Sequence, residues 1–153
     1  MKDFDPWNKK KREIEGRDKT PHFHQREVWW CSLGVNIGQE QDGKGGLYER
    51  PVLIFKKLNS QIFLGIPATS SYKNVYTIFA AGEDLKEFYF IVTQIRLISV
   101  KRLNRYMSKL TDDEFYKIRS AIFDVIDDSG REYYLRIVLN ALLDCYSATQ
   151  NPL

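Results

Sequence analysis

Two apolar runs joined by a short polar link stand near the middle of the chain and predict a β-hairpin. The runs are residues 52–55 and 62–66, and the link at residues 57–60 is prone to turn. In an antiparallel hairpin, the start of the first strand lies beside the end of the second. We therefore expect Arg50, which precedes the first run, and Thr69, which follows the second, to meet at one end of a sheet.

Other segments carry the alternation or the β-branched and aromatic residues that are typical of strands. They are residues 27–33, 75–79 and 87–93, then 95–98 after a bend at Gln94, and a weaker last strand at 105–110. Trp29 and Trp30 should point to opposite faces because side chains alternate along a strand, so one of them should enter the core. An aromatic share of 14% also favours β structure.

Helices are expected towards the C-terminus. Thr111 and Glu114 form a capping box, and an apolar stripe at helical spacing follows to about residue 126: Phe115, Ile118, Ile122 and Val125. Ser129 and Glu132 repeat the capping signature ahead of another apolar stripe. That second stripe needs a partner, either this domain or another subunit.

The N-terminal residues 1–25 are polar and carry both signs of charge. Phe4, Trp7, Lys11 and Ile14 recur at helical spacing, which predicts a short amphipathic helix on the main domain. The alternative is that the basic run at residues 9–12 contacts a nucleic-acid backbone. We expect an extension at 1–25, a main domain at 26–126 and a helical extension at 127–153. The fold class is mainly β (α+β), a small SH3-like, strongly bent antiparallel barrel with C-terminal helices.

Composition narrows the class of protein. A chain of 153 residues with 43% hydrophobic residues can build one domain with a real core, and a net charge of +3 permits an anionic partner without requiring one. Cys31 and Cys145 stand in no metal or redox spacing, so we interpret them as reduced packing residues of a cytoplasmic protein. No apolar run approaches the roughly 20 residues of a membrane span. The N-terminus also lacks the apolar core of a signal peptide.

Arg50 and Thr69 are the first candidates for chemistry. A guanidinium and a hydroxyl on adjacent strand ends can bind one phosphate together. The alternative for Arg50 is a salt bridge at the strand end, for example with Glu49 or Glu40. The alternative for Thr69 is a hydroxyl that satisfies its own turn.

A glycine-rich loop spans residues 34–49, and a loop of this length in a compact domain is more often functional or mobile than a mere connector. It is not a phosphate-binding P-loop, because the GKS or GKT sequence is absent. Glu40 and Gln41 are the polar groups that it could present to a ligand. A flexible surface loop is the alternative.

Two further features have open interpretations. His22 and His24 could bind a metal or act as an acid–base couple, but no Cys or third His completes a ligand set, which favours ordinary surface imidazoles. Residues 95–111 contain no acidic residue and five cations: Arg96, Lys101, Arg102, Arg105 and Lys109. This segment adjoins Gln94 and is either an RNA-facing patch or a solvated face.

Several pieces, taken in order from about Gln25 to Ile126, resemble the MazF/PemK family of toxin endoribonucleases. The pieces are EVWWCSLG, GQEQDG, ERPVLIFKK, GIPATSS, VTQIRLIS with KRL, and TDDEFYKIRSAI. The resemblance implies a barrel-like fold and a homodimer. It also implies cleavage of single-stranded RNA without metal or other cofactor, held in check by a cognate antitoxin protein, with no membrane partner.

The resemblance also implies roles for individual residues. Arg50 and Thr69 match the catalytic pair of the family, and Gln94 matches a residue that helps to shape the substrate site. The remaining substrate-binding positions are then Glu40, Gln41, Arg96 and Ser70, with no metal ligand. Gln39 stands where the family has a serine, and the loop at residues 43–49 is longer than the common pattern.

The chemistry implied by the family uses the nucleophile of RNA itself. The 2′-OH attacks the adjacent phosphorus and leaves a 2′,3′-cyclic phosphate and a 5′-OH end. Arg50 would stabilise the phosphorane charge, and Glu40 is a candidate base if its loop folds over the site. Two alternatives remain open. One is a toxin of the same fold that inhibits a protein through its C-terminal helix, and the other is an RNA-binding module without chemistry.

Overall fold

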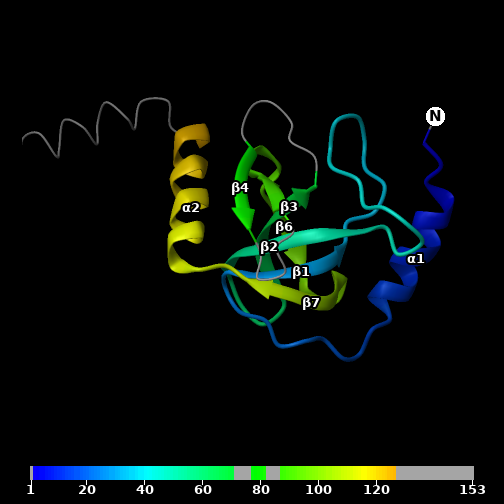
Figure 1. Ribbon diagram of the computed structural model, residues 1–153. Helices are drawn as coiled ribbons and strands as arrows, with labels where there is room; N and C mark the ends of the chain where they lie inside the picture. Colours follow the sequence, from blue (N-terminus) through cyan, green and yellow to red (C-terminus); the bar gives the residue numbers. More distant parts are fainter. Residues whose placement is uncertain (1, 71–76, 82–86, 127–153) are drawn as a thin grey trace, which may run out of the picture.

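One strongly bent antiparallel sheet forms the body of the molecule, with a helix at each end (Figure 1). The structure, a computed structural model, describes residues 2–70, 77–81 and 87–126. The strands are β1 (Glu27–Ser32), β2 (Glu49–Lys57), β3 (Ile62–Thr69), β4 (Thr77–Ala81), β5 (Glu87–Ile91), β6 (Arg96–Ser99) and β7 (Leu103–Lys109). The helices are α1 (Asp5–Glu15) and α2 (Asp112–Ile126), and two 3₁₀ turns are η1 (Val92–Gln94) and η2 (Val100–Arg102). The expected mainly β, bent antiparallel fold is confirmed, and the sheet is open.

The bend arises in β3, which pairs with two different strands along its length. The strand order is β4-β5-β3-β2-β1-β7, and β6 pairs with β3 outside that path. The first half of β3 pairs with β6, through Ile62 to Gly65, and its end pairs with β5, through Ala68 and Thr69. The η1 turn lies between β5 and β6 and lets one chain segment serve both halves. The predicted strand at 87–93 was therefore too long, because residues 92–94 turn instead of extending.

The central hairpin is confirmed, and both of its strands are longer than the apolar runs. β2 begins at Glu49 and β3 continues to Thr69, since each is paired on both sides. The last strand likewise begins at Leu103 and not at Arg105, because Leu103 pairs with Cys31 of β1. Pairing on neighbouring strands therefore decided where these elements end, and apolar content did not.

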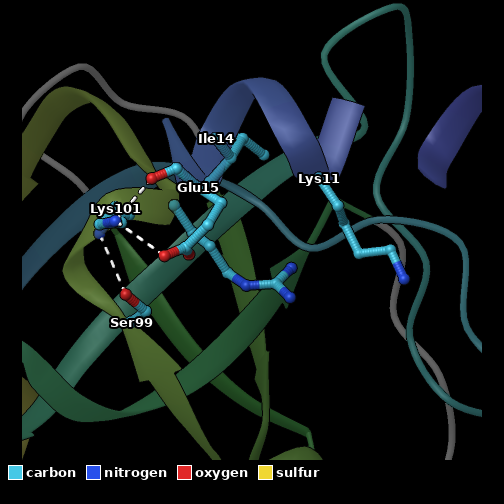
Figure 2. A pocket seen from close by; sticks show the side chains of 6 residues that line it. Lys11, Ile14, Glu15, Ser99 and Lys101 are labelled. Carbon is cyan, nitrogen blue, oxygen red and sulfur yellow. Dashed lines mark hydrogen bonds and ion pairs between the residues drawn. The ribbon is translucent and has the colours of Figure 1, made fainter. Parts of the chain in front are cut away.

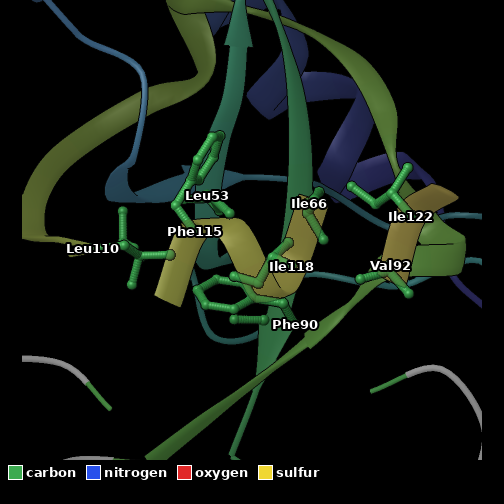
Figure 3. Close-up of a cluster of buried hydrophobic side chains, with 10 residues drawn as sticks. Leu53, Ile66, Phe90, Val92, Leu110, Phe115, Ile118 and Ile122 are labelled. Atoms are coloured by element: carbon green, nitrogen blue, oxygen red, sulfur yellow. The ribbon is translucent and has the colours of Figure 1, made fainter. Parts of the chain in front are cut away.

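Two apolar clusters fill the two faces of the sheet. Leu53 and Ile66 face α2, where they meet Phe90, Phe115 and Ile118 (Figure 3). The alternating residues of β2, Val52 and Ile54, face the other way, into a cluster with Phe23, Trp29, Cys31 and Phe63. Of the two adjacent tryptophans, Trp29 is thus the one in the core, and Trp30 lies under the Arg105 guanidinium at 4.4 Å.

The α2 helix starts as its capping box predicts. The Glu114 N–H donates to the Thr111 hydroxyl at 3.3 Å, and the Thr111 N–H donates back to the Glu114 carboxylate at 2.8 Å. Phe115, Ile118 and Ile122 are buried. The predicted second helix, its capping box and Cys145 lie in 127–153, outside the described residues, as do residues 75–76 of the predicted fourth strand.

The N-terminal helix α1 is also confirmed as amphipathic. Trp7 and Ile14 are buried, and Pro6 stands in the first turn, where its missing N–H costs nothing. Cys31 is a buried free thiol, and burial raises its pKa to about 12, as expected for a packing residue. None of the helices within residues 2–126 has both the length and the apolar character to span a membrane.

Candidate functional site

Arg50 and Thr69 stand at adjoining strand ends, as the hairpin predicts. β2 and β3 pair Val52 with Pro67, and continuing that antiparallel register by two residues places Arg50 opposite Thr69. Side chains directly opposite each other in such a pair share one face of the sheet. The side chain of Arg50 also crosses to β3, where Nη1 donates to the Ala68 carbonyl at 3.5 Å. The Arg50 and Thr69 side chains are therefore placed so that both could bind one ligand group.

The guanidinium of Arg50 is half-buried and held from one side. Its Nε donates to the backbone carbonyl of Asp42 in the long loop. Burial lowers the pKa of Arg50, and the negative charge of Asp42 opposes that shift. Within residues 2–70, 77–81 and 87–126, Nη2 has no hydrogen-bond partner and Arg50 makes no ion pair. The described contacts of the guanidinium are therefore made through Nε and Nη1 alone.

Among the described residues, Arg50 makes no salt bridge with Glu49 or Glu40, the two partners considered for it. The Glu49 carboxylate accepts from Arg105 Nη1 at 2.7 Å and from Asn104 Nδ2 at 2.9 Å, so its oxygens are already engaged. Glu40 is exposed, and only its backbone N–H makes a described contact, to Ile37 at 3.1 Å. The carboxylate whose charge acts on Arg50 is that of Asp42, which the sequence did not single out.

Thr69 is 7% exposed and closes β3 beside β5. Its pairing partner across the strands is Tyr89, whose side chain therefore lies on the same face of the sheet. Sequence reasoning missed Tyr89, because nothing local to residues 87–91 indicates which strand they pair with. Ser70 follows Thr69 and is exposed at the end of the strand.

Gln94 and Gln41 come together, but through the backbone of the loop. The Gln94 side chain accepts from the Gln41 N–H at 3.1 Å and donates to the Gln39 carbonyl at 3.1 Å. The Gln41 side chain donates to the Asp42 carbonyl at 3.3 Å, next to Arg50. In this arrangement Gln94 holds the loop, while its predicted contact with substrate stays a prediction.

Backbone hydrogen bonds connect separate positions of the long loop at residues 34–49. Gly34 and Gly43 bond to each other, with the Gly43 N–H donating to the Gly34 carbonyl at 2.8 Å. Lys44 and Glu49 form an isolated antiparallel bridge that closes the tip. A Cβ on Gly43 would stand 1.7 Å from the Tyr48 carbonyl oxygen, so glycine is required there. The loop therefore has hydrogen bonds of its own, and the alternative of a flexible surface loop stays open.

The predicted basic patch at residues 95–111 is not one continuous free face. Arg102 Nη1 donates to the Ser32 and Leu33 carbonyls, and Arg105 is paired with Glu49. Lys101 bonds both the backbone carbonyl and the carboxylate of Glu15 at the end of α1. Arg96 pairs in register with Gly65 on β3, half-buried, and it remains a candidate for ligand contact.

Lys101 and Arg102 also line a small cavity of about 270 Å³ between α1 and η2 (Figure 2). The other residues that line it are Lys11, Ile14, Glu15 and Ser99. The Glu15 carboxylate in this cavity is paired with Lys101, so the cavity is part of the contact between α1 and the η2 turn. It is not the place where Arg50 and Thr69 meet.

No cluster of three or more potential metal ligands occurs among the described residues. His24 is exposed, and its Nδ1 lies 3.0 Å from the Glu27 carboxylate, which is the ordinary surface role expected of it. His22 and His24 do not form part of the site around Arg50.

Comparison with known proteins identifies the class of this arrangement. Residues 24–126 match the family described as "PemK-like, MazF-like toxin of type II toxin-antitoxin system". The MazF of Deinococcus radiodurans superposes with a TM-score of 0.58 at 16% identity, covering 71% of this chain and 98% of that one. No curated protein is similar enough in sequence to be matched.

Two mycobacterial structures give similar superpositions. One is an endoribonuclease in complex with its cognate antitoxin, with a TM-score of 0.53 at 16% identity over 67% of this chain and 93% of that chain. The other is the Mycobacterium tuberculosis toxin MazF-mt6, with a TM-score of 0.52 at 16% identity over 67% of this chain and 97% of that chain. At 16% sequence identity, these similarities show only that the fold is shared.

Proposed function

The chain belongs to the PemK-like, MazF-like toxin family of type II toxin–antitoxin systems, and on that premise we propose that it is an endoribonuclease acting on single-stranded RNA. The observation that carries the proposal is the position of Arg50 and Thr69 at adjoining strand ends of β2 and β3. The Arg50 guanidinium and the Thr69 hydroxyl are then two donors for one phosphodiester.

The proposed chemistry needs no nucleophile from the protein. The 2′-OH of RNA attacks the adjacent phosphorus, the P–O5′ bond breaks, and the products are a 2′,3′-cyclic phosphate and a 5′-OH end. Arg50 stabilises the added negative charge on the non-bridging oxygens, with a planar fork that lysine does not reproduce. Thr69 orients the phosphate through its hydroxyl.

The proton transfers are assigned to groups other than Arg50. A guanidinium with an ordinary pKa above about 12 is a poor base. Glu40 is exposed and makes no described side-chain contact with the site, which weakens its earlier candidacy. We assign the proton from the 2′-OH to water or to a non-bridging oxygen of the substrate. The Tyr89 side chain lies on the same face of the sheet as Thr69, and we assign the proton of the leaving 5′-oxygen to water.

An incubation with RNA of mixed sequence, in EDTA, tests the proposal directly. The wild-type protein should produce fragments with 2′,3′-cyclic phosphate and 5′-OH ends. Arg50→Ala should lower the rate by about 100- to 1,000-fold, the usual cost of losing one preorganised donor. Thr69→Val, which keeps the shape and removes the hydroxyl, should lower it less.

Arg119→Ala is the matched control, because it removes the same charge from an exposed position on α2. Cleavage by Arg50→Ala at the wild-type rate would refute the assigned site. RNA that binds in a salt-dependent way but stays intact would point to a binding module instead.

We also propose a homodimer and an acidic antitoxin as partners. The mycobacterial neighbour is in complex with its cognate antitoxin, and a second Deinococcus radiodurans structure holds MazE with MazF. An acidic segment seated on Arg50 would occupy the edge of the guanidinium that RNA needs. Sedimentation of the protein alone tests the dimer. Inhibition of cleavage by an added acidic partner protein tests the second proposal.

A further inference from the structure

A single ammonium group fastens the N-terminal segment to the loop beside Arg50. Lys2 Nζ lies 2.7 Å from the Asp42 carboxylate and donates to the backbone carbonyls of Asn36 at 2.8 Å and Gly38 at 3.5 Å. These three groups come from both limbs of the loop at residues 36–42. Lys2 therefore holds the loop closed on itself, and it comes from outside residues 24–126, which match the family.

The α1 helix presses on the same loop through Trp7. The indole is 5% exposed and lies 5.4 Å from the Tyr48 ring at the far end of the loop. At the near end, Gly34 has a φ of +89°, and a Cβ there would stand 2.1 Å from the Trp7 ring. Trp7 thus packs where the loop leaves the sheet and where it returns.

From Asp42 the contacts lead directly to the catalytic guanidinium. The Asp42 carboxylate accepts from the Asn36 N–H at 2.6 Å, and the Asp42 carbonyl accepts from Arg50 Nε. Gln94 holds the loop through Gln39 and Gln41. Arg50 and Lys2 therefore bond the same residue, Arg50 through the Asp42 carbonyl and Lys2 through the Asp42 carboxylate.

We propose that residues 2–16 are a positioning element of the active site, in which Lys2 and Trp7 fix the loop so that Asp42 aims Arg50 at the phosphodiester. This inference rests on the proposed function for its catalytic consequence. Its physical basis is preorganisation, because a donor that is already aimed costs no reorganisation when charge develops. Lys2 acts through Asp42 and does not touch the substrate.

The test compares Lys2→Ala, Lys2→Arg and Lys9→Ala in the full chain. Lys9 is exposed on α1, the helix that follows Lys2, and has no described contact with the loop, so its loss controls for charge on RNA binding. Lys2→Ala should lower kcat by about three- to tenfold, the scale of a partly exposed ion pair with added hydrogen bonds. KM should stay within about twofold, because the substrate loses no contact. Lys2→Arg should recover most of the rate, because its guanidinium can bond the same oxygens.

Amide hydrogen exchange supplies a readout that needs no RNA. The Asn36 and Gln41 amides should exchange faster in Lys2→Ala than in wild type or Lys9→Ala, while the amides of β2 and β3 should not change. If Lys2→Ala matches Lys9→Ala in both exchange and kcat, the inference is wrong. If exchange rises in Lys2→Ala while kcat is unaltered, Lys2 stabilises the loop but does not position Arg50, and the inference is again wrong.

The two proposals fail differently. A wild-type protein that leaves RNA intact would overturn the proposed function, whatever the exchange of the loop. A wild-type protein that cleaves RNA, with Lys2→Ala cleaving equally fast, would overturn only the role of the N-terminal residues. A thermal melt of each variant distinguishes a misplaced Arg50 side chain from an unfolded protein. Lys2 is exposed, so its replacement should have little effect on global stability.

Discussion

The two ends of the sheet are held by different kinds of contact. At one end, α2 lies on an apolar face, where Phe115, Ile118 and Ile122 meet strand side chains (Figure 3). At the other end, α1 also buries Trp7 and Ile14, and directional contacts add to this packing, from Lys2 to the loop and from Glu15 to Lys101. Apolar burial is non-directional and mainly supplies stability. Each hydrogen bond or ion pair supplies less free energy but fixes the orientation of the groups that it joins. The candidate site around Arg50 lies at the α1 end of the sheet, where these contacts are found.

The largest effect on folding is expected at the α2 end. Ile118 is fully buried, so Ile118→Ala should lower the free energy of unfolding by about 2–5 kcal/mol. Ile118 packs on the face of the sheet opposite Val52, and Arg50 shares the face of Val52 by strand alternation, so the rate per folded molecule should stay the same. Urea denaturation and cleavage assays on the folded fraction check both expectations. A large loss of rate in the folded fraction would contradict the division between the two ends.

Gly34→Ala probes the α1 end through its backbone. Its φ of +89° is unfavourable for alanine, and the added methyl would meet the Trp7 ring. We expect a loss of about 1–3 kcal/mol in stability together with a slower reaction, because Trp7 must move. Gly46→Ala is the control in the same loop, since a Cβ there meets nothing within 4 Å. Equal behaviour of the two variants, by denaturation and by tryptophan fluorescence, would show that the packing of Trp7 does not matter.

Gln94→Ala sharpens the comparison on the polar side. The change removes two hydrogen bonds to the loop backbone, each worth about 1 kcal/mol, and should lower kcat/KM by about tenfold. Stability should fall by no more than about 2 kcal/mol, the sum of the two hydrogen bonds, because Gln94 is not part of either apolar cluster. Gln61→Ala removes an exposed amide side chain and should have no effect on cleavage. Cleavage rates and urea midpoints measured side by side decide whether Gln94 acts on the site or on the fold.

The smallest effect is a pH dependence from Asp42. Partial burial would raise the pKa of its carboxyl, but hydrogen bonds from Lys2 and Asn36 and the nearby positive charges hold that pKa below the usual value. A depressed folded pKa means that its stabilisation is present above about pH 4, the ordinary pKa of Asp. It is then lost as pH falls through the lower folded pKa.

The expected result is a shallower decline of stability below that pH in Asp42→Asn than in wild type. Urea denaturation at several pH values measures this slope. Asp18→Asn, at an exposed position, should leave the slope unchanged. The same slope in all three proteins would show that Lys2 does not stabilise the ionised form of Asp42.

Features that depend on neighbours in sequence were predictable. The central hairpin, the capping box at Thr111 and the amphipathic helix around Trp7 all follow from spacing of a few residues, and all are present. The position of Arg50 beside Thr69 follows from the hairpin alone, because antiparallel pairing brings those ends together. Strand ends were less predictable, since partners on other strands extended β2 and β3.

What the sequence alone determined, then, is the hairpin, the start of α2 and the pair of residues at the strand tips, because local hydrogen bonding and side-chain period specify them. Only the tertiary structure decided that Asp42 holds Arg50, that Gln94 and Lys2 hold the loop, and that Arg102 and Arg105 serve the fold. The sequence shows where an Arg or Lys stands in the chain, but it does not show which oxygen atom that side chain will bind. That choice depends on which chain segments packing brings within about 3 Å, the reach of a hydrogen bond.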